Sequence, residues 1–155
     1  MNILALDLGV SFGYAHRGGS GTIKLKKGKS KVGGAPDPRY AEFQDWLIGA
    51  LRLYEIQHVV FENVRHHSGT LASHMWGGWH AILHIECHAF GITLEGITVQ
   101  DIKQRATGKG NASKNEMMAA ALNRLGKKVI NDDEADALWL YDFATREVSI
   151  NAKAV

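Results

Sequence analysis

An aspartate stands inside a short apolar run near the start of the sequence. Residues 3–8 read ILALDL, and Gly9 ends the run. A run of this length that is bounded by glycine is typical of a buried β-strand. Asp7 would then lie inside a sheet, where an ionised carboxylate costs free energy unless something compensates its charge. The pattern therefore predicts both a strand and an acid that requires a partner.

Glu62 has the same setting as Asp7. It follows the mostly apolar residues HVVF, which predict a second buried strand at residues 58–63. A single acid at a strand end is often only a turn residue or the partner of a helix cap. Neither acid alone therefore specifies a functional site.

A third group of acids opens the last predicted helix, where four acids fall within five residues: Asp132, Asp133, Glu134 and Asp136. Asp133 and Asp136 are three residues apart and share one face of a helical first turn, which Asp132 could share as well. Crowded carboxylates raise each other's pKa, and a divalent cation removes that penalty. Carboxylate oxygens favour Mg²⁺ or Mn²⁺ over zinc. This group alone could be an acidic helix cap, but the three groups together favour a two-metal site that hydrolyses a phosphodiester.

The rest of the sequence predicts helices and strands around these acids. Two antiparallel strands with a turn at Gly18–Gly19 follow the first strand, and GITLEGITV predicts a later strand with a turn or break at Gly96. Residues 100–113 are expected to begin as a helical turn and become a glycine loop. Helices are predicted over residues 39–55, 71–90, 114–125 with a capping box at Ser113 and Glu116, and from Asp132 or Asp133 to about residue 148, before a tail.

Strands first, then alternating strands and helices, favour an α/β fold with one mixed sheet flanked by helices. The 155 residues are typical of one domain, so we expect a single nuclease domain over residues 1–155. The single cysteine, Cys87, excludes a disulfide framework and a Cys-rich zinc module. The sequence has neither a signal-peptide pattern nor an apolar stretch of about 18 residues, so we expect a cytoplasmic protein without a membrane span.

Basic residues are unevenly distributed, although 18 basic and 16 acidic residues give a net charge of only +2. Six basic residues and no acid lie between Arg17 and Lys31, and seven basic residues and one acid lie between residues 102 and 128. Basic segments beside a dense acidic cluster suit a phosphate polymer held at a metal site. The residues of these segments, and of the loop after Glu62, that we expect to contact the backbone of such a polymer are Lys24, Lys26, Lys27, Lys29, Arg65, Lys103, Arg105, Lys109 and Lys114.

Four segments together resemble one family. LALDLGVSFGYA, VVFENV and DDEADALWL, in this order and spacing, resemble the RuvC-type Holliday junction resolvases of the ribonuclease H-like superfamily. VQDIKQRATGKGNASKNEMM is similar to the stretch of that family with a Lys, then Thr-Gly-x-Gly, then Ala-x-Lys before a helix. The resemblance covers residues 3–144. The compact length and divergent loops favour a phage or prophage version.

The resemblance implies a ribonuclease H-like α/β fold with a five-stranded mixed sheet, its first three strands antiparallel, and helices on both faces. It also implies a homodimer with two Mg²⁺ ions per active site that cuts four-way DNA junctions symmetrically. Lys103 and Lys114 match basic residues that contact the DNA backbone and assist at the scissile phosphate. The acids that match the catalytic and metal-binding positions are Asp7, Glu62, Asp133 and Asp136, with Asp132 as the alternative to Asp133.

Other functions remain open at this point. A related nuclease that cuts other branched DNA, single-stranded DNA or RNA–DNA hybrids would use the same metal site, because substrate shape is recognised by loops and dimer geometry. An ATP-binding fragment of the sugar-kinase and actin type shares the LDLG start, but such proteins need a second domain and a second phosphate loop. A DNA-binding module without catalysis would leave four buried acids without a metal to compensate them.

The helix predicted over residues 71–90 carries more apolar residues than one core-facing stripe requires, namely Met75, Trp76, Trp79, Ile82, Leu83 and Ile85. We expect part of this helix to form the dimer surface. Its histidines recur every four residues, at His80, His84 and His88. Two such histidines can share a zinc ion, but the glutamate of an HExxH motif is absent, and we interpret them as residues of one helix face.

Overall fold

The polypeptide alternates strands and helices around one mixed sheet, in a computed structural model that describes residues 1–26, 37–64 and 69–153. The strands are β1 (Ile3–Asp7), β2 (Ser11–His16), β3 (Gly19–Lys24), β4 (His58–Asn63) and β5 (Thr93–Thr98). The helices are α1 (Pro38–Leu53), α2 (Thr70–Phe90), α3 (Val99–Thr107), α4 (Lys114–Leu125) and α5 (Asp132–Lys153). Three of the predicted DNA contacts, Lys27, Lys29 and Arg65, lie outside the described residues.

The sheet has the order β3-β2-β1-β4-β5. β2 pairs antiparallel with both β1 and β3, whereas β4 pairs parallel with both β1 and β5. This is the five-stranded mixed sheet with three antiparallel strands that the resemblance implied. The parallel strands require crossover helices between them, and α2 connects β4 to β5.

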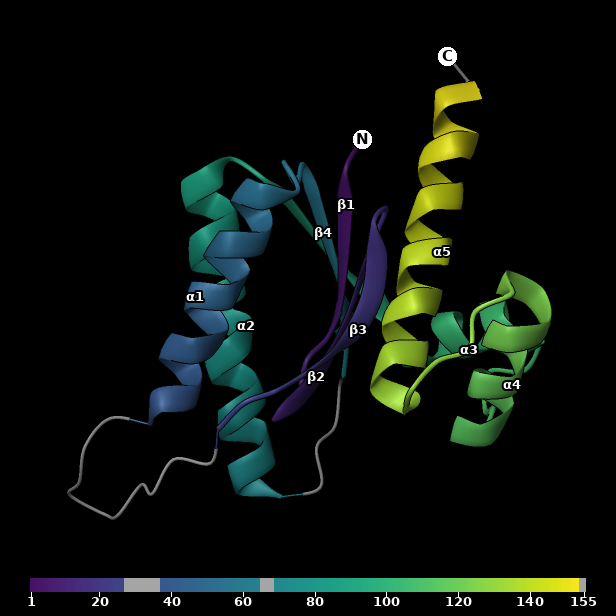
Figure 1. The fold of residues 1–155 in the computed structure, drawn as a ribbon, viewed down its shortest axis with the longest axis horizontal. Coiled ribbons are helices and arrows are strands. Elements are labelled where there is room, and N and C mark those ends of the chain that lie inside the picture. The colour runs from purple at the N-terminus through teal and green to yellow at the C-terminus, as the bar shows by residue number, and fades with distance from the viewer. Residues whose placement is uncertain (27–36, 65–68, 154–155) are drawn as a thin grey trace.

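Helices cover both faces of the sheet, as predicted (Figure 1). Successive side chains of a strand point to opposite faces. Ile3 and Ala5 of β1 pack in a core beneath α3, α4 and α5, whereas Leu4 and Leu6 pack in a second core beneath α1 and α2. β1 is thus buried on both sides, which explains its nearly continuous apolar sequence.

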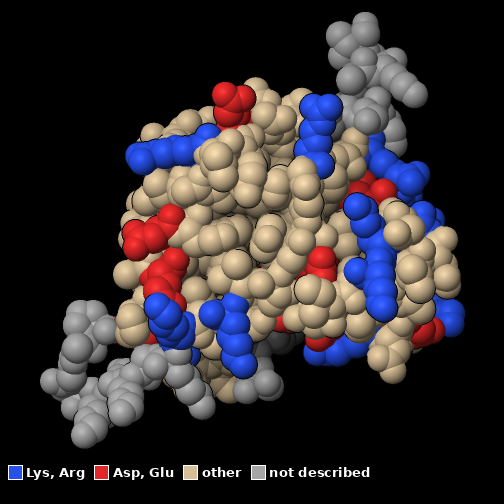
Figure 2. Space-filling model, viewed as in Figure 1, with Lys and Arg blue, Asp and Glu red and all other residues tan. Residues whose placement is uncertain are grey.

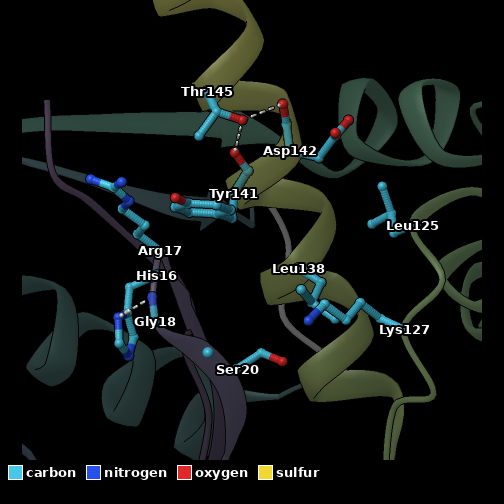
Figure 3. Close-up of a pocket in the computed structure, with 11 residues that line it drawn as sticks. His16, Arg17, Gly18, Ser20, Leu125, Lys127, Leu138, Tyr141, Asp142 and Thr145 are labelled. Atoms are coloured by element: carbon cyan, nitrogen blue, oxygen red, sulfur yellow. Dashed lines mark hydrogen bonds between the residues drawn. The ribbon is translucent and has the colours of Figure 1, made fainter.

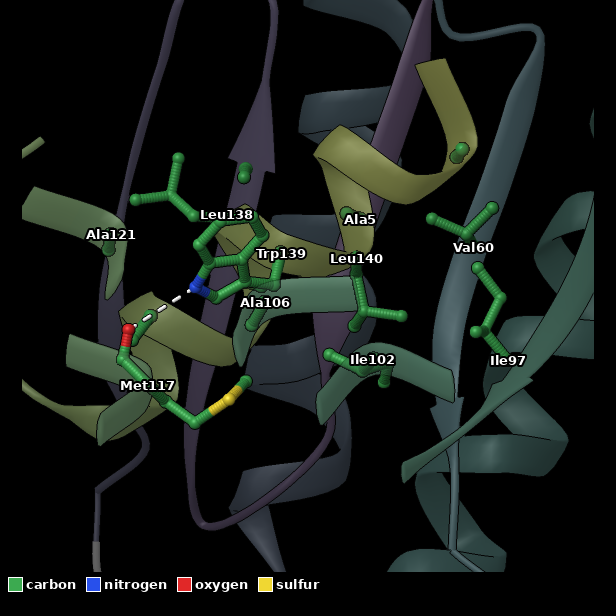
Figure 4. Packing of buried hydrophobic residues seen from close by; sticks show 14 of the residues in the cluster. Ala5, Val60, Ile97, Ile102, Ala106, Met117, Ala121, Leu138, Trp139 and Leu140 are labelled. Atoms are coloured by element: carbon green, nitrogen blue, oxygen red, sulfur yellow. Dashed lines mark hydrogen bonds between the residues drawn. The ribbon is translucent and has the colours of Figure 1, made fainter. Parts of the chain in front are cut away.

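The core beneath α5 is organised around Trp139 (Figure 4). This side chain is fully buried, and its indole N–H donates a hydrogen bond of 3.2 Å to the backbone oxygen of Met117 in α4. Ile102 and Ala106 of α3 belong to the same core. α3 and α4 are therefore fixed against α5, which in turn packs on the sheet.

The carboxyl ends of β1 and β4 lie at the same end of the molecule as the first turn of α5 (Figure 1). Because β1 and β4 run parallel, both strands deliver their last residues to this edge. The three predicted groups of acids lie on these three elements. The topology therefore brings together residues that are more than 120 positions apart in the sequence, as the 122-residue separation between hydrogen-bonded Ser11 and Asp133 illustrates.

The local predictions are largely confirmed, with three differences. The capping box of Ser113 and Glu116 opens α4, and α2 ends at Gly91, as expected. β5 runs through Gly96 without a break, α3 is a helix of nine residues rather than a single turn, and α5 continues to Lys153, where a tail was expected.

The expected dimer surface on α2 is smaller than predicted. Met75, Trp79 and Leu83 are buried in the core between α2 and the sheet, and only Ile85 of the predicted set is largely exposed. Gly78, one of the two glycines inside this helix, permits a close approach of α1, since a Cβ there would stand 2.3 Å from the Tyr40 ring. Among the described residues, no helix is long and apolar enough to cross a membrane.

Candidate active site

The register of the sheet places Asp7 and Glu62 on the face that α5 covers. Asp7 shares the face of Ile3 and Ala5, because alternate residues of a strand point the same way. Glu62 shares the face of Val60 for the same reason. The strand alternation that makes β1 and β4 suitable for burial thus also aims their final carboxylates at the start of α5.

Gly13 allows the start of α5 to lie directly on the sheet. It stands opposite Asp7 in the β1–β2 ladder, so its missing side chain would point to the same face as the Asp7 carboxylate. A Cβ at this position would stand 1.8 Å from the backbone oxygen of Asp133. Real Cβ atoms essentially never come that close to another atom. The backbone of α5 therefore occupies the space that a larger residue would need.

Two hydrogen bonds fix the first residues of α5 to the neighbouring strands. The hydroxyl of Ser11 in β2 donates to Oδ2 of Asp133 at 2.7 Å. The hydroxyl of Thr22 in β3 donates to Oδ1 of Asn131 at 2.8 Å, and the same oxygen accepts the backbone N–H of Glu134 at 3.0 Å. Asn131 thereby satisfies an otherwise unpaired amide at the helix start, which is the role of an N-cap.

Glu134 has a structural role among the four acids at the start of α5. It is buried, and its carboxylate accepts hydrogen bonds from the hydroxyl of Ser20 at 2.8 Å and from the backbone N–H of Ile130 at 2.7 Å. A buried carboxylate with two donors is satisfied within the protein and also lies at the favourable end of the helix dipole. The hydrogen bond from Ser20 holds α5 against β3. Glu134 is therefore not one of the acids that we assign to the candidate metal site.

Asp7 is the acid on which burial and the charges of the other acids act together. Burial raises the pKa of Asp7 well above its ordinary value, and the negative charges of Glu62, Asp136 and Asp133 raise it further. The contact between the Asp7 and Glu62 carboxyl groups acts in the same direction on the pKa of Asp7. The acids from β1, β4 and α5 are therefore close enough to disfavour one another's ionisation.

Burial raises the pKa of both Asp136 and Glu62, but their neighbours act on the two acids differently. Burial, followed by the charges of Glu62 and Asp132, raises the pKa of Asp136 to about 7, against the opposing influence of Lys103 and Lys114. Burial also raises the pKa of Glu62, while its hydrogen bond with Asp7 and the charge of Lys103 lower it. The cluster carries more negative charge than its two neighbouring lysines compensate.

Asp132 and Asp133 differ in their surroundings. Asp132 forms an ion pair with Lys114, the first residue of α4, and this hydrogen bond lowers the pKa of Asp132. Asp133 accepts from Ser11, and its charge is one of those that raise the pKa of Asp7. Asp133 therefore lies near Asp7, whereas Asp132 lies near Asp136 and links α5 to α4 through Lys114.

Carboxylate oxygens are the donors that a hard divalent cation prefers, and the excess of negative charge at this cluster is what such an ion would neutralise. Within the described parts of the chain, no three His, Cys, Asp or Glu side chains stand close enough to hold a metal ion in their present positions. The donor chemistry thus fits Mg²⁺ or Mn²⁺, and the side chains would need to converge further on binding.

The predicted DNA-contacting residues fall into two sets. Lys24 ends β3 opposite Ser11, and exposed Lys26 follows it, beside Glu42 at 3.8 Å. Arg105 is instead held by Asp142, at 2.8 Å from its Nη2, and exposed Lys109 lies 3.2 Å from Glu116. Figure 2 shows several Lys and Arg side chains on the side of the molecule formed by α3, α4 and α5.

A separate groove of about 300 Å³ lies between the β2–β3 turn and α5 (Figure 3). Its lining includes Arg17 of the turn, Lys127 and Tyr141, and none of the five acids predicted for the metal site. The hydroxyl of Thr145, also in its wall, donates to backbone oxygens within its own helix. The groove is therefore distinct from the candidate active site.

Ser11 and Gly13 are the two residues of the site that the sequence did not reveal. Their importance depends on the register of β2 against β1 and on where α5 approaches the sheet. A serine and a glycine in a strand carry no local signal for either relationship. Only the alternation of Gly13 and Ala15, two small residues on one face, hints that another element approaches closely there.

No family model matches the sequence, and no curated protein matches it either. The chain does match solved structures. A Thermus thermophilus RuvC structure has 16% sequence identity and a TM-score of 0.67, with 91% of each chain covered. T. thermophilus RuvC in complex with a Holliday junction substrate has 16% identity and a TM-score of 0.71, over 91% of this chain and 90% of that one.

The yeast mitochondrial Holliday junction resolvase Ydc2 is similar over 90% of this chain and 75% of its own length, with 14% identity and a TM-score of 0.61. The likeness extends across the sheet and the helices on both of its faces, since so much of the chain is covered. The chain therefore has the ribonuclease H-like fold that is shared with the RuvC-type Holliday junction resolvases.

Proposed function

We propose that this protein is a metal-dependent endonuclease that resolves four-way DNA junctions by hydrolysing phosphodiester bonds at symmetric positions. The observation that carries the proposal is the clustering of Asp7, Glu62 and Asp136, which come from three separate elements: Glu62 and Asp136 raise the pKa of Asp7, and Glu62 raises the pKa of Asp136. Clusters of strongly perturbed acids are characteristic of functional sites. The fold shared with junction resolvases supports a nuclease among the functions that such a cluster can serve.

Two Mg²⁺ or Mn²⁺ ions would be held by Asp7, Glu62, Asp136 and Asp133. When bound, such ions activate a water molecule and stabilise the oxygen that leaves the phosphorus atom. Burial and the neighbouring acids disfavour the ionised form of Asp7, which is the form that would bind a metal ion, and the charge of such an ion would favour it again. Ser11 would hold the Asp133 carboxylate in place through its hydrogen bond.

Lys103 and Lys114 would act on the phosphate of the substrate. Both lie close enough to the acids to lower the pKa of Asp136. Lys114 is paired with Asp132 in the absence of DNA, so its ammonium group is already held beside the cluster. A phosphate that entered the site could take over this ammonium group, which would then stabilise the charge that develops during cleavage.

DNA affinity would come from exposed lysines outside the cluster. Lys24 and Lys26 lie at the end of β3 and are exposed to solvent, as a residue that contacts the phosphate backbone must be. Lys27, Lys29 and Arg65 complete this set in the proposal. Such contacts provide affinity that depends on salt and is independent of DNA sequence. Arg105 and Lys109 are paired with Asp142 and Glu116 in the absence of DNA, as Lys114 is paired with Asp132.

Resolution of a four-way junction requires two nicks related by two-fold symmetry. A homodimer with both active sites on one face provides that symmetry. The exposed apolar residues of α2, including Leu71 and Ile85, are the surface that we propose for the second copy. Light scattering at micromolar concentration would test this assignment, and an Ile85→Asp variant that lowers the apparent mass would support it. A monomer that makes paired symmetric cuts would contradict it.

The decisive experiment compares cleavage of synthetic four-way, three-way, flap and linear DNA and of an RNA–DNA hybrid in the presence of Mg²⁺. Paired symmetric cuts in the four-way junction alone would support the proposal. Preference for another substrate would identify the related nuclease considered above. Asp7→Asn serves as the control for contaminating nucleases, since it removes the central carboxylate and retains a side chain of nearly equal size.

A further inference from the structure

His80 and His84 lie one turn apart on α2, and their side chains point at each other. The Nε2 atoms of the two imidazole rings are 3.2 Å apart. Residues four positions apart are neighbours on a helix surface, but neighbours need not direct the same ring atom at one point in space. Here the same ring atom of each residue lies next to the other, with the two rings edge to face and their centroids 4.5 Å apart, which the spacing in the sequence could not show.

This separation is the one that two ligands of a single metal ion require. Zinc–nitrogen bonds of about 2.0–2.1 Å at a tetrahedral angle place two nitrogen ligands roughly 3.3 Å apart. We propose that His80 and His84 form a binding site for a transition-metal ion such as Zn²⁺ on the face of the sheet opposite the acidic cluster. The sequence favoured a plain helix face because it lacked the HExxH glutamate, but that residue is a general base and is not needed for binding.

The ring of His80 is held in place by two aromatic neighbours. It stacks on Trp76 with ring centroids 4.6 Å apart and an interplanar angle of 15°, and it lies 5.0 Å from the ring of Phe61 in β4. A ligand that is already fixed loses little rotamer freedom when it binds a metal ion. His84 is exposed, so the ion could reach the pair from solvent.

The chemistry of the pair separates it from the acidic cluster. Imidazole nitrogens suit zinc, nickel and copper, whereas carboxylate oxygens suit magnesium and manganese. Burial and the charge of His84 lower the pKa of His80, which favours the neutral, ligating form. Within the described part of the chain no third His, Cys, Asp or Glu completes a metal-binding group, so water would fill the remaining positions.

A hydrogen bond between two neutral rings is the alternative explanation of the contact. In that arrangement one ring carries its proton on Nε2 and donates it to the lone pair of the other. A metal ion instead requires both lone pairs, so the donor ring must move its proton to Nδ1. Both arrangements occupy nearly the same space, and metal titration distinguishes them.

The test is calorimetric titration of the intact protein with Zn²⁺ in a large excess of Mg²⁺, which keeps the carboxylates occupied. His84→Ala removes one ligand from an exposed position and should weaken Zn²⁺ binding about tenfold or more, the usual range for perturbed metal sites. His88→Ala is the matched control one turn further along α2 and should bind Zn²⁺ as the wild type does. Equal binding by wild type and His84→Ala, absence of saturable binding, or equal losses in both variants would overturn the site.

A second measurement locates the ion independently of affinity. Cu²⁺ quenches nearby tryptophan fluorescence, and Trp76 stacks on one of the proposed ligands. Saturable quenching should occur in the wild type, decrease in Trp76→Phe and disappear in His84→Ala at the same Cu²⁺ concentration. Quenching that His84→Ala leaves unchanged would contradict the assignment. Neither measurement depends on nuclease activity, so the proposal stands or fails separately from the proposed function.

Discussion

The backbone oxygen of Asp133 occupies the place where a side chain of Gly13 would begin, since a Cβ there would stand 1.8 Å away. Gly13→Ala should therefore displace α5 from the sheet and cost about 1–3 kcal/mol of the free energy of unfolding, the usual range for overpacking. Urea denaturation measures this loss. Gly19→Ala is the matched control, because a Cβ at that strand residue meets nothing within 4 Å. Equal stability of the two variants would show that α5 does not approach β2 so closely.

Asp133 and Glu134 allow the anchoring of α5 to be separated from its chemistry. Ser11→Ala removes the hydroxyl that binds Asp133, and Ser20→Ala removes the one that binds Glu134. Each should cost about 0.5–1.5 kcal/mol, the net worth of a typical hydrogen bond. Only Ser11→Ala should raise the Mg²⁺ concentration required for half-maximal cleavage, because only Asp133 is a proposed ligand. Identical metal dependence in both variants would remove Ser11 from the site.

Acid should stabilise the metal-free protein across the range in which Asp136 titrates. The pKa of Asp136 is raised from 3.8 to about 7, so the folded state holds this proton more tightly than the unfolded chain does. Stability from this group is fully present below pH 3.8 and is lost as the pH rises through about 7. Asp136→Asn should flatten that slope in urea denaturation series without metal. A slope of opposite sign would contradict the raised pKa.

Binding of a divalent metal ion should restore the stability that the protein loses at neutral pH when Asp136 ionises. An ion that binds only the folded state stabilises it by about 2.7 kcal/mol at 100 times its dissociation constant. Mg²⁺ should therefore raise the melting temperature of the wild type. Asp7→Asn should be more stable than the wild type without metal, because it removes the most strongly disfavoured charge, and should respond little to Mg²⁺. A variant that keeps the full Mg²⁺ response would exclude Asp7 as a ligand.

Substitutions in the two sets of lysines should have different effects on DNA binding and on cleavage. Simultaneous replacement of Lys24, Lys26, Lys27 and Lys29 by glutamine should weaken binding of every DNA form and reduce the salt slope by about 0.9 for each phosphate that is no longer neutralised. Lys103→Gln should slow cleavage more than it weakens binding, because Lys103 lies beside Glu62 and Asp136. Filter binding and single-turnover cleavage measure the two effects. Weaker binding of only one DNA form would exclude a backbone role.

The acids of the site could be selected from the sequence because each interrupts or ends a regular pattern. Asp7 and Glu62 end apolar strands, and the DDEAD letters open a helix, so their positions on elements follow from periodicity alone. Parallel strands end at one edge, and the resemblance supplied a five-stranded mixed sheet with its first three strands antiparallel. The fold was thus accessible from local patterns combined with one long-range assumption.

The partners of those acids could not be selected, because each depends on how two elements meet. That Ser11 binds Asp133 while Lys114 binds Asp132 follows from the rotation of α5 about its own axis, which no local pattern encodes. The ion pair of Arg105 could not be selected for the same reason, because its partner Asp142 lies on a different helix. The predicted dimer face of α2 failed in part because a helix packed against both a sheet and α1 buries a wider stripe than periodicity suggests.

The hydrogen bond between Ser11 and Asp133 spans 122 residues of sequence. Contacts of such long range form late, since the entropy of closing a long loop is lost before the contact contributes any stability. The acidic cluster is consequently absent from any state in which α5 has not docked, even if β1 is already paired with β2 and β4. Catalytic competence in this architecture is a property of the completed fold, and partly folded chains would carry the acids without carrying the activity.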